Sequence, residues 1–171
     1  MILIKLRYIS TLVLILSLIL IISLFIGSIK SLYNISIKSI NKDKVCLLSE
    51  TPYYKILYYC KDPYIAKCIS ETKYPYTLAA IAKVESDYRP QIVGDKGASH
   101  GLLQIQRKWY GDIPDSVSAQ CAKGESIFDG HYRRHSYRDA ISKYNGTGKP
   151  SRVYADKVLK AKREIILCLK S

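Results

Sequence analysis

A run of 22 residues without a charge lies between Arg7 and Lys30 and consists mainly of Ile and Leu. As a helix it would be about 33 Å long, enough to cross the hydrocarbon core of a bilayer. Lys5 and Arg7 before it are typical of the start of an export signal. Ile26-Gly27-Ser28 is only a weak candidate for a signal-peptidase cleavage site, which favours a retained anchor over a cleaved signal. We assign residues 1–29 to a signal peptide or transmembrane anchor.

The remaining residues suffice for one domain. Residues 30–60 begin as a polar stretch without periodicity and are predicted to be a linker and lead-in, and residues 61–171 to be the domain. Helices are predicted near 63–71, 75–86, 117–128, 137–144 and 152–169, with a loop or small hairpin over 91–104. In the last helix, the apolar positions predict a buried face that includes Val153 and Val158. The domain is expected to be mostly helical.

The domain is strongly basic. The chain carries a formal charge of +13, and only two of its 27 Lys and Arg residues precede residue 30. Positive charge suits a polyanionic partner. Because an export segment is present, we expect cell-surface polyanions, namely peptide-bearing glycan strands of the wall or anionic lipid headgroups, and no nucleic acid.

Five cysteines follow the apolar run and none forms a Cys-x-x-Cys pair, which argues against a redox motif or zinc ribbon. In an exported domain they predict one or two disulfides, with at least one thiol left over. The pairing stays open. The cysteines are Cys46, Cys60, Cys68, Cys121 and Cys168.

Glu85 is the strongest catalytic candidate. It follows Leu78, Ile81 and Ala82 at helical spacing, so a carboxyl group ends a buried apolar stripe. Burial disfavours the charged form and raises the pKa of a carboxyl group, which keeps it able to donate a proton near neutral pH.

Three short motifs extend this argument, namely Glu85-Ser86, then Gly101-Leu102-Leu103-Gln104, then Tyr144-Asn145-Gly146. Their order and spacing resemble the soluble lytic transglycosylase domain of the lysozyme-like superfamily. The resemblance covers residues 75–160. After Gln104 the chain departs from the Met-Pro-x-Thr of many members and is closer to compact enzymes of secretion systems and phages.

The resemblance implies an α+β, mostly helical lysozyme-like fold that cleaves the β-1,4 bond between MurNAc and GlcNAc in peptidoglycan. Glu85 would act as acid and then as base, and no cofactor or metal is implied. Four further residues are expected to contact the sugar, since they offer hydroxyl, amide and phenol groups. They are Ser99, Gln104, Tyr144 and Asn145.

The second carboxylate of animal lysozymes is replaced by Ser99, two residues before Gly101. Most glycosidases need two carboxylates. The resemblance implies instead that the MurNAc acetamido group attacks its own anomeric carbon, and that the product is 1,6-anhydro-MurNAc. Two alternatives stay open: a hydrolytic muramidase that uses Asp87 or Asp95 as the second carboxylate, and a non-catalytic, membrane-anchored wall-binding scaffold.

Other features add little. His131 and His135 are four residues apart but lack further ligands at zinc-site spacing, so surface histidines are favoured over a metal site. The implied activity requires export, which predicts a cell-envelope location, either anchored in the inner membrane and facing the periplasm or exported. The expected partners are glycan strands, the membrane through the N-terminal helix, and a secretion, conjugation or phage machine.

Overall fold

The computed structural model describes residue 17, residues 21–28 and residues 42–169. The chain divides into two units, Met1–Asn41 and Lys42–Ser171, of which the second contains the fold. Residues 21–28 are helical. Within the described ranges, no helix has both the length and the apolar character needed to cross a membrane. Most of the expected signal or anchor, residues 1–29, lies outside the described residues.

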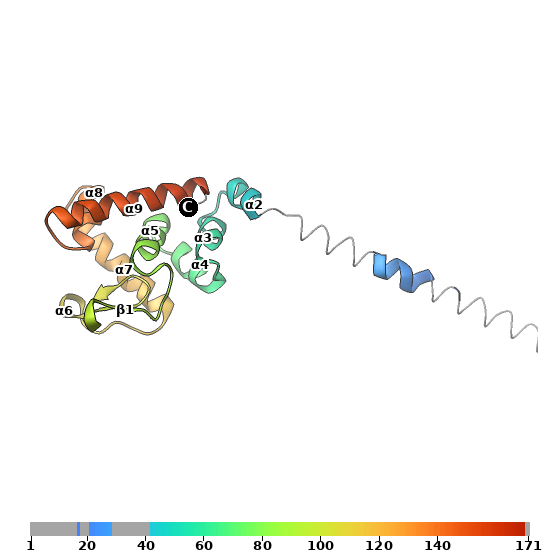
Figure 1. The fold of residues 1–171 in the computed structure, drawn as a ribbon, viewed down its shortest axis with the longest axis horizontal. Coiled ribbons are helices and arrows are strands. Elements are labelled where there is room, and N and C mark those ends of the chain that lie inside the picture. The colour runs from blue at the N-terminus through green and yellow to red at the C-terminus, as the bar shows by residue number, and fades with distance from the viewer. Residues whose placement is uncertain (1–16, 18–20, 29–41, 170–171) are drawn as a thin grey trace, which may run out of the picture. The chain divides into compact units, whose positions relative to one another are not determined.

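The second unit is built around the helix that carries Glu85. This helix, α5, packs mainly against α9 and also contacts α3, α4 and α7 (Figure 1). Leu78, Ile81 and Ala82 on α5 are fully buried, which confirms the apolar stripe predicted from the sequence. The helices are α2 (Lys42–Leu48), α3 (Pro52–Cys60), α4 (Pro63–Ser70), α5 (Pro75–Ser86), α6 (Arg107–Tyr110), α7 (Val117–Tyr132), α8 (Tyr137–Tyr144) and α9 (Lys149–Leu167).

A small antiparallel sheet follows α5. Its strands are β1 (Val93–Gly94), β2 (Ser99–His100) and β3 (Ile105–Gln106), in the order β1-β2-β3, with the 3-10 turn η1 (Asp95–Gly97) between the first two. Ser99 pairs with Gly94 on one side and with Gln106 on the other. The domain is therefore mostly α-helical, as the sequence predicted, and the loop or small hairpin expected over 91–104 is a three-stranded sheet that extends to Gln106.

Local signals set several helix starts. The Asp62 side chain accepts hydrogen bonds from the backbone N–H groups of Tyr64 and Ile65 at 2.8 and 3.0 Å, so it caps α4, and Pro63 occupies the first turn. Helix α8 has the predicted bounds, and α7 extends four residues beyond its predicted end at 128.

Two helices occupy the region expected to be a linker and lead-in. Lys42–Leu48 forms α2 and Pro52–Cys60 forms α3, and Ile56 of α3 is fully buried in the core. The compact unit therefore begins at Lys42, earlier than the domain start at residue 61 proposed from the sequence. The reason is that α3 contacts α4, α5 and α9 with its apolar side chains.

The buried face of α9 differs from the predicted one. Val153 is 50% exposed, whereas the neighbouring Tyr154 is buried, together with Val158, Ala161 and Ile165. Tyr154, Val158, Ala161 and Ile165 recur at helical spacing, so the buried stripe is shifted by one residue from Val153. This shift brings a tyrosine, rather than a valine, against α5.

One disulfide joins the two ends of the second unit. Cys46 of α2 is bonded to Cys168, which caps the C-terminus of α9, across a sequence separation of 122. Cys60, Cys68 and Cys121 are free thiols. This agrees with the expectation of at least one disulfide and a surplus thiol.

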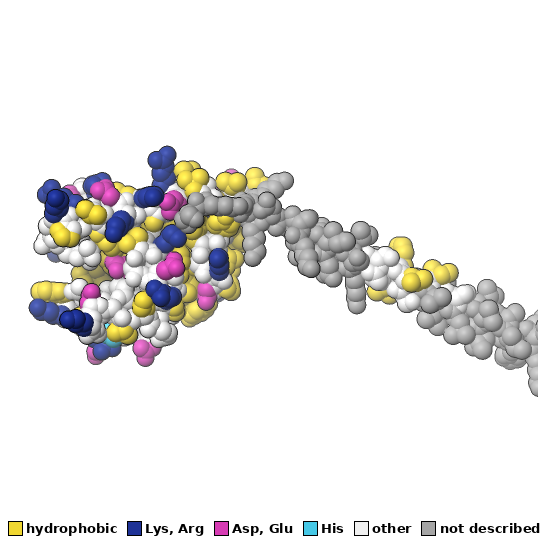
Figure 2. Space-filling view, in the orientation of Figure 1, with side chains coloured by type: hydrophobic (Ala, Val, Ile, Leu, Met, Phe, Trp, Pro, Cys, Tyr) yellow, Lys and Arg dark blue, Asp and Glu magenta, His cyan; other side chains and the backbone are white. Residues whose placement is uncertain are grey.

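In Figure 2, Lys and Arg side chains are dispersed over the visible face with acidic side chains between them.

We predict that removing this disulfide destabilises the domain. Because the bond closes a long loop, the chain-entropy model gives a loss of about 5 kcal/mol in the free energy of unfolding. Urea unfolding of the Cys46→Ser/Cys168→Ser variant, compared with the native protein, measures this loss. Dithiothreitol should lower the midpoint of the native protein but leave that of the variant unchanged. An equal midpoint for both proteins without reductant would contradict the prediction.

Candidate active site

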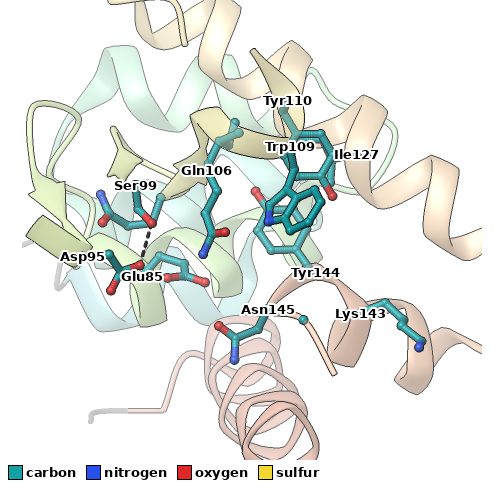
Figure 3. Close-up of a pocket in the computed structure, with 13 residues that line it drawn as sticks. Glu85, Asp95, Ser99, Gln106, Trp109, Tyr110, Ile127, Lys143, Tyr144 and Asn145 are labelled. Carbon is teal, nitrogen blue, oxygen red and sulfur yellow. Dashed lines mark hydrogen bonds between the residues drawn. The ribbon is translucent and has the colours of Figure 1, made fainter. Parts of the chain in front are cut away.

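A cleft of about 220 Å³ brings the predicted site residues together. Glu85 comes from α5, Ser99 from β2, Gln104 from the turn before β3, Tyr144 from α8, and Asn145 from the C-cap of α8. All five line this cleft (Figure 3). The other lining residues are Asp95, Ile105, Gln106, Trp109, Tyr110, Ile127, Lys143 and Gly146.

The Glu85 carboxyl group lies in the last turn of α5. Its pKa is raised from 4.5 to about 7, mainly by burial, and the nearby negative charge of Asp95 acts in the same direction. The Tyr154 hydroxyl acts in the opposite direction and lowers the pKa. Desolvation outweighs the hydroxyl, so near neutral pH Glu85 exchanges a proton readily.

Tyr154 of α9 is a site residue that the sequence analysis missed. Within the described residues, its buried hydroxyl makes no hydrogen bond of standard geometry. It nevertheless lies close enough to Glu85 to stabilise the carboxylate, and the charge of Glu85 in turn raises the pKa of Tyr154. The hydroxyl is therefore a donor held near the carboxyl oxygens. The available signal was the helical stripe through Val158 and Ile165, which includes Tyr154.

The turn at Leu102 and Leu103 is tied to three helices. Ser86 Oγ of α5 donates to the Leu102 carbonyl at 2.7 Å, and Gln120 Oε1 of α7 accepts from the Leu102 N–H at 2.7 Å. Tyr144 Oη of α8 donates to the Leu103 carbonyl at 3.2 Å. Ser86, which directly follows Glu85, therefore holds the Gly101–Gln104 segment against α5.

Two glycines allow this close packing. Gly101 has φ +79°, and a Cβ atom there would lie 2.4 Å from Gln120 Oε1. A Cβ atom on Gly124 of α7 would lie 2.2 Å from Leu103 Cδ1. A Cβ atom would therefore displace the side chain of Gln120 or of Leu103, and at Gly101 the positive φ also favours glycine.

Ser99 and Gln104 use their donors within the protein. Ser99 is 2% exposed, and its hydroxyl donates to Asp95 Oδ2 at 2.7 Å. Gln104 Nε2 donates to the carbonyls of Ile92 and Gly101 at 3.0 and 2.9 Å, and Gln104 adopts φ +45°. These hydrogen bonds hold the cleft wall in place.

Tyr144 and Asn145 differ in exposure. The Tyr144 hydroxyl is deeply buried, and the charge of Glu85 contributes to raising its pKa, which places the phenol near the acid as the sequence suggested. Asn145 is exposed at the C-terminal end of α8, and its amide is free to face a ligand (Figure 3).

The two candidates for a second carboxylate occupy different places. Asp87 caps α5 in a left-handed conformation, is exposed, and is not among the residues that line the cleft. Asp95 lines the cleft, and its carboxylate lies at the same end as Glu85 (Figure 3). Its Oδ2 accepts the hydrogen bond from Ser99.

No metal site is apparent in the part of the chain that the structure describes, where no three His, Cys, Asp or Glu side chains gather suitably. His131 Nε2 lies 3.3 Å from the Tyr110 hydroxyl.

Neither a scan against family models nor searches of curated proteins and solved structures finds a match to this chain.

The raised pKa of Glu85 predicts a pH-dependent stability. Because the folded-state pKa of about 7 exceeds the ordinary 4.5, folding disfavours the carboxylate, and this penalty develops as the pH rises from about 4.5 to about 7. Glu85→Gln removes it. Above pH 7.5 the Glu85→Gln variant should be more stable than the native protein by about 2 kcal/mol. This is less than the full pKa shift would give, because Glu85 is partly exposed to the cleft.

Urea unfolding at pH 8 and at pH 4 measures this difference, which should vanish at the lower pH. Glu71→Gln, at an exposed position at the end of α4, is the matched control. A native protein at least as stable as Glu85→Gln at pH 8 would refute the prediction.

A second prediction concerns Tyr154. Since its hydroxyl lowers the pKa of Glu85, Tyr154→Phe should raise that pKa above the native value. Carbon-13 NMR titration of the Glu85 carboxyl group reports the shift directly. Tyr64→Phe, on the exposed side of α4, should leave the titration unchanged. A purely structural role for Tyr154 would give the same Glu85 pKa in the native protein and the Tyr154→Phe variant.

Proposed function

We propose that this protein is a peptidoglycan lytic transglycosylase with a lysozyme-like domain. It cleaves the β-1,4 bond between MurNAc and GlcNAc and leaves a 1,6-anhydro-MurNAc end. The observation that carries the proposal is the Glu85 carboxyl group, which lines the cleft and has a pKa of about 7. Such a group can both give and take a proton near neutral pH. The helical domain, small sheet and shared cleft of all five predicted residues support the same reading.

In the first step Glu85 donates its proton to the glycosidic oxygen, and the bond from the MurNAc anomeric carbon to that oxygen breaks. Positive charge builds at the anomeric carbon as the bond breaks. The carbonyl oxygen of the 2-acetamido group on the same sugar then bonds to this carbon. The substrate thus supplies the nucleophile.

In the second step the Glu85 carboxylate takes the proton of the 6-hydroxyl group. The 6-oxygen bonds to the anomeric carbon and displaces the acetamido oxygen, which closes the 1,6-anhydro ring. Glu85 ends protonated, as it began, and no water is consumed. Tyr154 stabilises the carboxylate between the two steps, since its hydroxyl lies close to it.

A hydrolytic muramidase is the second candidate, and Asp95 favours it. The Asp95 carboxylate lies at the Glu85 end of the cleft, is oriented by Ser99, and raises the pKa of Glu85 by its charge. An ionised carboxylate beside a protonated one is the pair that glycoside hydrolysis uses. Asp95 would then act as nucleophile or as the base that activates water.

We further propose that the domain acts in the cell envelope, anchored in the inner membrane and facing the periplasm or exported. The Cys46–Cys168 disulfide supports an oxidising compartment. The peptidoglycan there would be opened locally, as a secretion, conjugation or phage machine requires. No cofactor takes part in the proposed reaction.

Mass spectrometry of fragments released from purified peptidoglycan tests the proposal. The native chain should release 1,6-anhydro-MurNAc ends, and Glu85→Gln should release fragments about a thousandfold more slowly while still binding the wall. Asp95→Asn should keep the anhydro product. Reducing-end MurNAc, lost in Asp95→Asn, would establish hydrolysis instead, whereas wall binding without release by the native chain would establish the non-catalytic scaffold.

A further inference from the structure

Trp109 is the single tryptophan of the chain and lies at the edge of the cleft. It is 68% exposed, although a large aromatic side chain normally gains much by burial. It comes from the short helix α6, directly after β3, and lies across the cleft from Asp95 (Figure 3). An exposed ring at a cleft mouth is suited to cover the apolar face of a ligand.

The cleft is too small to enclose a polymer. Its volume of about 220 Å³ is below the roughly 300–1,000 Å³ of pockets that surround a drug-sized ligand. A glycan strand would therefore extend beyond the cleft and over the protein surface on either side of Glu85. The Trp109 ring offers a flat surface there, and the C–H face of a pyranose ring packs against such a surface.

Charge divides the cleft into two ends. Glu85 and Asp95 lie together at one end. Lys143 lines the cleft on the side remote from them (Figure 3), and Lys108 Nζ lies 4.9 Å from the centre of the Trp109 ring. Lys143 is exposed, so its ammonium group is available to a ligand. The Trp109 end therefore suits a sugar that carries a negative charge.

We propose that Trp109 and Lys143 form a subsite for a sugar ring that bears a carboxylate. The ring stacks on Trp109, and Lys143 pairs with the carboxylate, which in peptidoglycan is the lactyl group of MurNAc or an acid of its peptide. The subsite selects acidic wall glycan over a neutral polymer of GlcNAc. This inference rests on the proposed function, because it names the substrate of the same cleft.

The single tryptophan makes the subsite directly observable. Full-length Glu85→Gln protein, in a non-ionic detergent without sugar or aromatic groups, is titrated with MurNAc–GlcNAc strands and with GlcNAc oligomers of equal length. Bound strands should shift Trp109 emission to shorter wavelength and reduce its quenching by iodide at least twofold. Emission and quenching that stay unchanged, while calorimetry shows the strands bound, would overturn the subsite.

Variants separate the two contacts. By calorimetry, Trp109→Ala should weaken strand binding about tenfold. Lys143→Gln should weaken binding of the acidic strands about threefold without affecting the neutral oligomers. Lys157→Gln removes the same charge from an exposed position on α9 outside the cleft and should have no effect. Equal losses for Lys143→Gln and Lys157→Gln, or equal affinity for acidic and neutral glycans, would refute the charge selection.

The outcome also separates this inference from the proposed function. If the native chain cleaves peptidoglycan while Trp109 emission does not respond to bound strands, the subsite is wrong and the enzyme assignment stands. If neither glycan binds the Glu85→Gln protein and the native chain releases nothing from the wall, the proposed function fails and the subsite with it.

Discussion

The hydrogen-bonded turn at Leu102 and Leu103 is the constraint on which the rest of the site depends. Its backbone polar groups are buried, and buried peptide groups are costly unless they are paired. Ser86, Gln120 and Tyr144 pair them from three different helices. Because each of these bonds fixes one helix against the same turn, the acid, the sheet and the aromatic wall of the cleft are held in one arrangement.

Around this turn the protein places a largely buried carboxyl group beside an exposed one. The acid is desolvated enough to hold a proton near neutral pH, yet Asp95 beside it is exposed and bonded to Ser99. Left-handed backbone at Asp95 and Gln104, both non-glycine residues, lies next to the acid. Such conformations cost free energy and are kept where the surrounding contacts dictate them, often at functional sites.

Much of this arrangement could be predicted from the sequence, because local signals determine it. The stripe of Leu78, Ile81 and Ala82 predicted a buried acid, and the helices predicted over 75–86 and 137–144 have the bounds of α5 and α8. The role of Tyr154 was missed, because hydropathy favours Val153 as the buried residue, although the helical stripe through Val158 and Ile165 includes Tyr154. The Cys46–Cys168 pair joins residues 122 positions apart, so it depends on the whole fold and no local pattern reveals it.

That bond also determines what happens when the chain is cut. Cys46 and Cys168 enclose α3 through α9, and hence both helices that hold Glu85 and Tyr154. A protease that severs one peptide bond between the two cysteines, for example in the segment at 111–116 after α6, opens the loop but releases no fragment. The two pieces remain one covalent molecule, so a single cut in that segment does not release α9 from α5 as a separate fragment.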